Sequence, residues 1–124
     1  MAFQEVGTGF VGQYYQFFAT ERAALAGVYG PTSLMTWCGE QIQGVEAIMA
    51  KLATLPFQQA QFKLEETDCH PSVSNGVLVV CQGEVMLPGE SHSLRFNDVF
   101  HLSLEEGRWM VTNQIFRILG GGSV

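Results

Sequence analysis

The sequence has few charged residues, few prolines and no long apolar run. Charged residues make up 15% of the 124 residues, and only four residues are proline. No apolar stretch approaches the roughly 20 residues that cross a bilayer as a helix. The N-terminal residues also lack a charged segment followed by an apolar one, which a secretory signal would show. We therefore expect neither a membrane span nor a signal peptide.

Basic residues are scarce. Lys and Arg number 6 against 12 Asp and Glu, so the net charge is -6 and the isoelectric point is near 4.8. A nucleic-acid backbone is bound through clustered Lys and Arg, so this balance argues against a nucleic-acid partner and favours a basic protein partner. Because 47% of the residues are hydrophobic, we expect an apolar surface that a partner or a ligand covers.

Cysteine is also rare, and no motif for catalysis or for a cofactor is present. Cys38, Cys69 and Cys81 are odd in number and are not spaced as metal ligands. We interpret them as free, mostly buried thiols in a reducing compartment. Glycine-rich phosphate loops, nucleophile elbows and zinc-ligand spacings do not occur. The sequence therefore predicts no cofactor, no metal and no catalytic residue set.

The clearest structural pattern lies at residues 95–119, RFNDVFHLSLEEGRWMVTNQIFRIL. Phe96, Phe100, Leu102 and Leu104 alternate with polar residues, as in a half-buried strand. The charged, glycine-containing residues 105–108 interrupt this alternation, and a second β-rich run follows, so the stretch predicts a long β-hairpin. Asp98 falls on the apolar face, where a carboxylate is not expected.

The preceding residues predict helices followed by further strands. Apolar residues at helical spacing predict a helix over 4–19 and another from Gly44 to the stop at Pro56. Between and after them we expect a short helix at 21–26 with Thr20 as its N-cap, a turn at Gly30-Pro31, and strands at 33–37, 41–43, 60–64 and 77–87. The order predicts an α+β fold in one domain, residues 1–124. We expect a cone-shaped half-barrel, in which a curved antiparallel sheet wraps around the N-terminal and middle helices.

Large apolar residues at the ends of the predicted elements are candidates for a binding site. Trp37 closes a predicted strand, and Leu55, Pro56 and Phe57 follow the middle helix. One interpretation is that they fill the core, where large aromatics are mostly found. The other is an apolar socket that receives an aromatic side chain of a partner. Phe3 raises the same question, as part of a frayed terminus or as an exposed aromatic contact.

Four titratable residues are candidates for acid–base chemistry: Asp68, His70, Asp98 and His101. A carboxylate facing a dry pocket has a raised pKa and can move a proton, and Asp98 is the strongest candidate. The alternative for Asp98 is a strand bulge or a hydrogen bond to nearby backbone, and we prefer that explanation, because structural groups also break the pattern. Asp68, Cys69 and His70 are consecutive, and neighbouring residues of a strand point to opposite faces, so they do not form a catalytic triad.

The chain resembles the nuclear transport factor 2 family over most of its length. The similarity is carried by residues 7–29 (GTGFVGQYYQFFATERAALAGVY), 34–44 (LMTWCGEQIQG), 47–58 (AIMAKLATLPFQ), 95–102 (RFNDVFHL) and 111–118 (VTNQIFRI). The resemblance implies a non-enzymatic homodimer, paired through the outer faces of its sheets. It would bind the small GTPase Ran in its GDP form and phenylalanine-glycine repeats of nuclear-pore proteins. The expected location is the cytoplasm and nucleus, concentrated at the nuclear envelope.

The resemblance also implies which residues would bind. An aromatic side chain of Ran would enter a socket made of Trp37, Leu55, Pro56, Phe57, Ala60, Ile115 and Phe116. The surrounding rim would contain Cys38, Glu40, Glu90 and Gln114, and Phe3 would contact the nuclear-pore repeats. The indole of Trp37 is expected to stay open to solvent, so that Trp37→Ala abolishes Ran binding and leaves the fold intact.

The sequence departs from the family pattern mainly at the rim. Cys38 stands where relatives carry an acid, and Gln114 where some carry an aspartate. The acidic cluster before the hairpin is reduced to residues 88–90, which leaves Glu40 and Glu90 to compensate. Ala60 replaces a larger aliphatic residue, which predicts a roomier socket, and Phe62 replaces a histidine.

Two other functions remain open from the sequence. The cone could hold a small molecule, as a carrier or an isomerase-like enzyme with Asp98 as the general base near Tyr14 or Tyr15. The chain could also be a scaffold subunit of a nuclear export complex. A deep cavity with an ionisable carboxylate would favour the first alternative, and co-purification with a related domain would favour the second.

Overall fold

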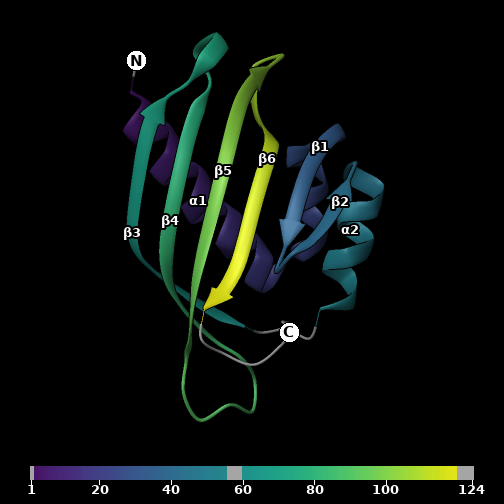
Figure 1. Ribbon diagram of the computed structural model, residues 1–124, viewed down its shortest axis with the longest axis vertical. Coiled ribbons are helices and arrows are strands. Elements are labelled where there is room, and N and C mark those ends of the chain that lie inside the picture. The colour runs from purple at the N-terminus through teal and green to yellow at the C-terminus, as the bar shows by residue number, and fades with distance from the viewer. Residues whose placement is uncertain (1, 56–59, 120–124) are drawn as a thin grey trace.

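The computed structural model describes residues 2–55 and 60–119. They form a single curved sheet with one long helix across it and a shorter helix at its side (Figure 1). In chain order the elements are α1 (Phe3–Thr20), the 3-10 helix η1 (Arg22–Val28), β1 (Tyr29–Trp37), β2 (Glu40–Gln43), α2 (Val45–Thr54), β3 (Gln61–Pro71), the 3-10 turn η2 (Val73–Asn75), β4 (Val77–Met86), β5 (Leu94–Glu105) and β6 (Arg108–Leu119). This is the α+β layout that the sequence predicts.

The six strands form a sheet in the order β2-β1-β6-β5-β4-β3. Neighbouring strands are antiparallel except β1 and β6, which run parallel. The outermost strands β2 and β3 are not paired with each other, so the sheet curves without closing into a barrel. Helix α1 crosses one face of it, and α2 lies beside β1 and β2 (Figure 1). The predicted half-barrel around two helices is therefore confirmed.

The β5–β6 hairpin matches the sequence pattern closely. Its strands pair from Arg95↔Leu119 to Glu105↔Arg108, and Glu106 and Gly107 form the two-residue connection with φ of 51° and 80°. Two positive φ values in succession are typical of the hairpin turn whose twist matches that of the strands. Phe96, Phe100 and Leu102 are buried as predicted. Leu104 is not, because it lies at the end of the strand and is 54% exposed.

Helix α1 is held by one apolar stripe. Val11, Tyr14, Tyr15 and Phe18 are buried against the sheet. Near its start the helix comes very close to β3: a Cβ added at Gly7 would lie 2.1 Å from the sulfur of Cys69. Glycine therefore serves packing at this position, although it lowers helix propensity by about 1 kcal/mol relative to alanine.

Two local predictions are wrong. Thr20 does not cap the second helix; its hydroxyl donates back to the Gln16 carbonyl at 2.7 Å, inside α1. Gly30 and Pro31 lie within β1 rather than in a turn, where the pairing of β1 with β6 shifts register between Tyr29 and Leu34. A proline can occupy a strand at such an irregularity, because no ladder hydrogen bond from its nitrogen is required there.

Candidate functional site: an aromatic stack beside a buried polar network

Four aromatic rings stack in a column at one end of the sheet's inner face. The Trp37 ring lies between Phe116, at 4.0 Å and 10°, and Phe18, at 6.2 Å and 5°. Phe96 continues the column beyond Phe116 at 5.7 Å and 20°. Near-parallel rings at these separations add to the free energy gained by burying them. The column joins α1 to three strands of the sheet.

Strand pairing explains why these rings meet. Trp37 ends β1 and lies directly opposite Phe116 of β6, and the backbone N–H of Cys38 donates to the Phe116 carbonyl at 2.9 Å. Leu55 and Ala60, which flank the connection from α2 to β3, belong to the same buried cluster. Of the predicted socket, Trp37 and Phe116 are thus in direct contact, and Leu55 and Ala60 are buried in the same core. Pro56 and Phe57 lie outside the described residues.

The expectation of an open indole is wrong for this structure. Trp37 exposes 2% of its surface, and Phe116 exposes 1%. Both rings fill the core, as the simpler interpretation of the sequence had it. A partner's side chain could reach Trp37 only after the side chains around the indole rearrange.

Two predicted binding residues lie elsewhere. Ile115 is 52% exposed and points to the outer face of the sheet, because it neighbours Phe116 on β6 and strand side chains alternate between faces. Gln114 is 1% exposed and lies in the interior, so it does not belong to a surface rim. Ile115 therefore cannot line a socket on the inner face together with Trp37, and Gln114 lies on that face but is covered.

The other predicted rim residues are at the surface. Cys38 is half-buried with φ of 48° in the turn between β1 and β2. Glu40 follows it and forms an ion pair with Lys51 of α2 at 2.9 Å, with its side chain 60% exposed. Glu90 is exposed in the β4–β5 connection. Carboxylates are therefore available to a partner at both places.

Phe3 is the first residue of α1 rather than a residue ahead of it. Its side chain is half-buried and packs against the core cluster. The aromatic ring is therefore anchored against the core at the start of the helix and remains partly accessible.

A polar network lies next to the aromatic column, deep inside the cone. Asp98 is fully buried opposite Phe116, and its carboxylate accepts hydrogen bonds from the Tyr15 hydroxyl and from the Gln114 amide at 3.0 Å. Pairing of β5 with both neighbours is regular at Asp98, so no bulge is present. Hydrogen bonds from the side chains of Tyr15 and Gln114 explain why a carboxylate can lie on the apolar face of β5.

Three further hydrogen bonds close a ring within the network. Tyr29 has one hydroxyl proton, which it donates to the side-chain oxygen Oε1 of Gln114 at 2.6 Å. The 2.7 Å contact between Tyr14 and Tyr29 must then have Tyr14 as the donor. The Gln114 amide completes the ring by donating to Tyr14 at 3.2 Å. Each member both donates and accepts, so the ring is satisfied without water.

Burial dominates the electrostatics of this network. It raises the pKa of Asp98 well above its usual range, while the hydrogen bonds from Tyr15 and Gln114 partly oppose that rise. Burial, together with the nearby Asp98, also raises the pKa of Tyr15. The Asp98 carboxyl is 0% exposed and already accepts hydrogen bonds from two side chains, so it cannot reach a substrate. The arrangement therefore favours a structural role for Asp98 over that of a general base.

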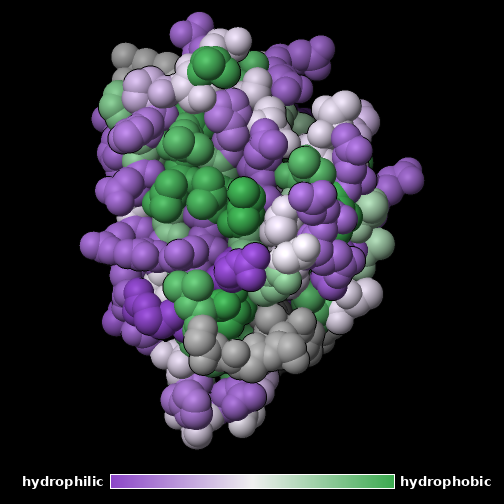
Figure 2. Space-filling view, in the orientation of Figure 1, coloured by the Kyte–Doolittle hydropathy of each residue, from purple (hydrophilic) through white to green (hydrophobic). Residues whose placement is uncertain are grey.

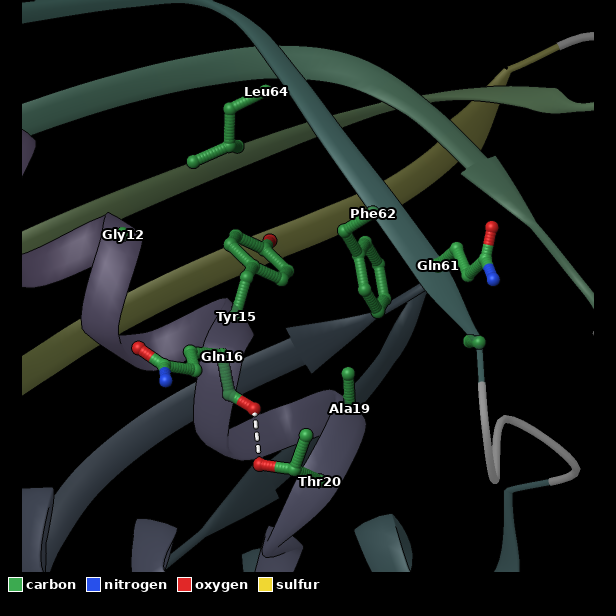
Figure 3. Close-up of a pocket in the computed structure, with 9 residues that line it drawn as sticks. Gly12, Tyr15, Gln16, Ala19, Thr20, Gln61, Phe62 and Leu64 are labelled. Carbon is green, nitrogen blue, oxygen red and sulfur yellow. Dashed lines mark hydrogen bonds between the residues drawn. The ribbon is translucent and has the colours of Figure 1, made fainter.

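A surface hollow of about 440 Å³ lies between α1 and the start of β3. Tyr15 and Phe62 lie side by side along it, with ring centroids 4.6 Å apart, and Gln16 and Thr20 line its α1 side (Figure 3). Among the described residues of the predicted socket, Ala60 lines this hollow, and Trp37, Leu55, Ile115 and Phe116 do not. The hollow is open to solvent, and the buried Tyr15 hydroxyl is already bonded to Asp98, so the described lining residues offer no acid–base pair to a ligand.

The remaining titratable candidates do not assemble into a site. Asp68 and His70 are exposed on β3. The ring nitrogens of His101 contact the hydroxyls of Thr112, at 2.7 Å, and Ser72, at 2.9 Å, with no carboxylate among its hydrogen-bond partners. Within residues 2–55 and 60–119, no group of His, Cys, Asp and Glu could hold a metal ion. None of the helices in these ranges is long and apolar enough to cross a membrane.

The outer face of the sheet carries an apolar patch (Figure 2). Val80, Val99 and Ile115 are direct neighbours across β4, β5 and β6, and Val80 and Ile115 are 41% and 52% exposed. Leu78, 36% exposed, adjoins this row on β4. Apolar side chains in consecutive strands of one open face are typical of a contact surface.

Sequence patterns alone did not reveal Tyr29 and Gln114 as members of the network. One signal was present: Gln114 shares the inward face with Phe116, as Asp98 shares it with Phe96. Two polar residues that interrupt the apolar faces of adjacent strands can pair. The strand register was needed to see that they do.

The sequence is similar to a known protein family over most of its length. A model of the nuclear transport factor 2 (NTF2) domain matches residues 6–118. Nuclear transport factor 2B of Arabidopsis thaliana is 44% identical over 115 residues, which cover 91% of each chain. Nuclear transport factor 2 of Schizosaccharomyces pombe is 36% identical over 117 residues, 94% of this chain and 95% of the relative.

A solved structure agrees with these sequence matches. The structure of nuclear transport factor 2 from Cryptosporidium parvum superposes with a TM-score of 0.89 at 41% identity, covering 94% of both chains. The yeast Ubp3–Bre5 complex contains a chain with a TM-score of 0.83 at 20% identity. The latter likeness concerns the fold alone.

Proposed function

The chain belongs to the nuclear transport factor 2 family, and we propose that it carries Ran in its GDP form into the nucleus by binding Ran and phenylalanine-glycine repeats of nuclear-pore proteins. The observation that carries this proposal is the match of relatives named as nuclear transport factors over more than nine-tenths of both chains. A carrier of this kind would be found in the cytoplasm and nucleus and concentrate at the nuclear envelope.

We place the Ran contact at the aromatic stack. Trp37 and Phe116 stack there, and Leu55 and Ala60, which flank the connection between α2 and β3, are buried in the same core. An aromatic side chain from Ran would extend the column of rings, once the neighbours of the buried indole rearrange. Aromatic anchors that fill apolar pockets commonly supply most of the binding free energy of an interface.

Charge would guide the encounter. The chain carries a net charge of -6, and Glu40 and Glu90 are exposed near chain turns. The Glu40–Lys51 pair is a surface ion pair, which contributes only about 0–1 kcal/mol, so Glu40 can exchange Lys51 for a basic residue of Ran at little cost. Because Cys38 is not an acidic residue, this part of the rim can form fewer ion pairs with basic residues of Ran.

The outer apolar row is the proposed homodimer contact. Val80, Val99 and Ile115 span three central strands and leave the inner stack free for Ran. Phe3, partly accessible at the start of α1, is the proposed contact for the nuclear-pore repeats. The outer row and Phe3 lie on different elements from Trp37 and Leu55. A dimer could therefore bind Ran and the nuclear-pore repeats at the same time.

A titration with a matched pair of tryptophan variants tests the proposal. Binding of purified Ran to the wild-type protein, to Trp37→Phe and to Trp109→Phe is measured calorimetrically, with Ran loaded with GDP or with GTP. Both substitutions keep an aromatic ring, and Trp109 lies at the far end of β6, next to the hairpin turn. We expect binding of the GDP form alone, with an affinity about tenfold lower for Trp37→Phe and unchanged for Trp109→Phe. Absence of binding to Ran-GDP at micromolar protein would overturn the proposal.

A further inference from the structure

Arg22 binds the carboxyl-terminal ends of two helices at once. It is the half-buried first residue of η1, directly after the end of α1. Its Nε donates to the Phe18 carbonyl of α1 at 3.4 Å, and its Nη1 donates to the Leu52 carbonyl of α2 at 2.9 Å and to that of Leu55 at 3.4 Å. The side chain therefore ties the end of α2 to the end of α1.

The end of α2 is a place where such a contact has consequences. The last carbonyls of a helix have no partner within the helix, and their partial negative charge favours a cation. Leu55 leaves the helix in an extended conformation, with φ of -75° and ψ of 140°. The direction of the chain beyond α2 is set at this residue, and Arg22 holds its carbonyl oxygen.

Arg22 also contacts the aromatic column itself. Its guanidinium carbon lies 4.6 Å from the centroid of the Phe18 ring, whose other neighbour in the column is Trp37. A planar guanidinium can lie over a ring and donate several hydrogen bonds from its edge at the same time, whereas an ammonium group is a compact charge without such a flat edge. Burial lowers the pKa of Arg22, yet an arginine keeps its charge at neutral pH.

We infer that Arg22 is a positioning residue for the proposed Ran site. By holding the end of α2 while covering Phe18, it fixes Leu55 against the rings that would receive the partner's side chain. Arg22 acts through Leu55 and Phe18. This inference rests on the proposed function, but its structural part can be tested without Ran.

The test uses Arg22→Met, with Arg108→Met as the matched control. Methionine keeps an unbranched apolar stem over Phe18 and removes every hydrogen bond of the guanidinium. Arg108 makes the same kind of contact, from Nη2 to the Gly27 carbonyl at 2.5 Å, but at the start of β6, away from the stack. Both are made in the Trp109→Phe background, where Trp37 is the only indole, and the quenching of its fluorescence by acrylamide is measured in the free protein.

The expected result is faster quenching of Trp37 in Arg22→Met and wild-type quenching in Arg108→Met, at a temperature where circular dichroism shows both to be folded. Affinity for Ran-GDP should fall about tenfold or more in Arg22→Met, as for lost hydrogen bonds from a charged donor, and less than twofold in Arg108→Met. If Arg22→Met does not fold, Arg22→Lys replaces it. Lysine can reach one carbonyl without spanning both, so an intermediate quenching rate is expected.

Each other outcome is decisive. Wild-type quenching in the folded Arg22 variant overturns the inference. Faster quenching with unchanged affinity for Ran-GDP shows that Arg22 holds the helix end without serving the site, and also overturns it. If the parent protein fails to bind Ran-GDP while quenching rises in Arg22→Met alone, the proposed function is overturned and the clamp on α2 stands.

Discussion

Ile115 and Phe116 are adjacent on β6 but have opposite environments. Phe116 is 1% exposed within the aromatic column, and Ile115 is 52% exposed on the outer face. The same contrast runs through the central strands: the inner face holds rings and a satisfied polar network, and the outer face holds the row Val80, Val99 and Ile115. The inner face is buried and stabilises the fold, whereas the outer row is exposed and is the homodimer contact that we propose.

The difference shows that one strand can serve two purposes, because its side chains alternate between faces. Substitutions on the inner face should change folding stability strongly. Substitutions on the outer face should change assembly and leave folding nearly unaltered. The following experiments separate the two faces by the size of these effects.

The largest effect is expected from Trp37→Ala. Removing a ring packed between Phe18 and Phe116 should lower the free energy of unfolding by about 3–5 kcal/mol, measured by urea denaturation. The sequence-based expectation that this substitution leaves the fold intact is therefore revised. Trp109→Ala, at a half-buried position, serves as the control and should lose clearly less. Equal losses would mean that the column has no special part in stability.

A smaller loss is expected from Gln114→Leu. Leucine has a similar volume but leaves the Tyr29 hydroxyl without its acceptor, which should cost about 1–3 kcal/mol, while Asp98 keeps Tyr15 as a donor. Gln82→Leu is the control, because Gln82 bonds to Glu66 near the surface and should change stability by no more than about 0.5 kcal/mol. Thermal unfolding followed by circular dichroism measures both, and a neutral Gln114→Leu would contradict the network.

Stability should also depend on pH through Asp98. Burial raises the pKa of its carboxyl in the folded state, so the folded protein binds this proton more tightly than the unfolded chain does. The contribution of Asp98 to stability is therefore complete below the ordinary aspartate pKa, near 3.9, and is lost as the pH rises toward the folded pKa, by up to about 1.4 kcal/mol per pH unit.

Asp98→Asn removes this titration and retains an oxygen that can accept from Tyr15. Its free energy of unfolding should fall less than that of the wild-type protein between pH 5 and pH 8, measured by urea denaturation at both values. Parallel pH dependences in the two proteins would show that Asp98 does not titrate in this way.

The smallest effect on folding is expected from Ile115→Glu. The side chain is half exposed, so the secondary structure and the unfolding transition of the protomer should be almost unchanged, within about 0.5 kcal/mol. Dimerisation should be weakened, because a charge would be placed in the apolar row. Sedimentation velocity measures the dimer fraction, and Val73→Glu, at an apolar residue 77% exposed away from the sheet, should leave it unchanged. A monomeric wild-type protein would contradict the proposed contact.

Much of the fold follows from local patterns. Alternation identified the β5–β6 hairpin, and the glycine at its turn marked the connection, since both depend on residues close in sequence. The turn predicted at Pro31 is wrong, because proline usually marks a turn but lies here within a strand. Only the register shift between β1 and β6 shows why the strand tolerates it.

The site was harder to predict because its parts are distant in sequence. Asp98 stood out on an apolar face, but its partners Tyr15 and Gln114 lie 83 and 16 residues away along the chain. The family resemblance indicated Trp37 and Phe116 correctly as neighbours, and it placed Ile115 on the wrong face and Gln114 on the surface. Alternation along β6 already places Ile115 and Phe116 on opposite faces, whereas the burial of Gln114 depends on partners from other elements, which the sequence pattern did not specify.

The most direct test of the central claim follows Trp37 itself. The Trp109→Phe protein is prepared with 5-fluorotryptophan, so that Trp37 gives the only fluorine resonance, and Ran is added in its GDP or GTP form. We predict that Ran-GDP shifts the Trp37 resonance saturably and that Ran-GTP leaves it unchanged. If Ran-GDP binds and the resonance does not move, the aromatic stack is not the binding site.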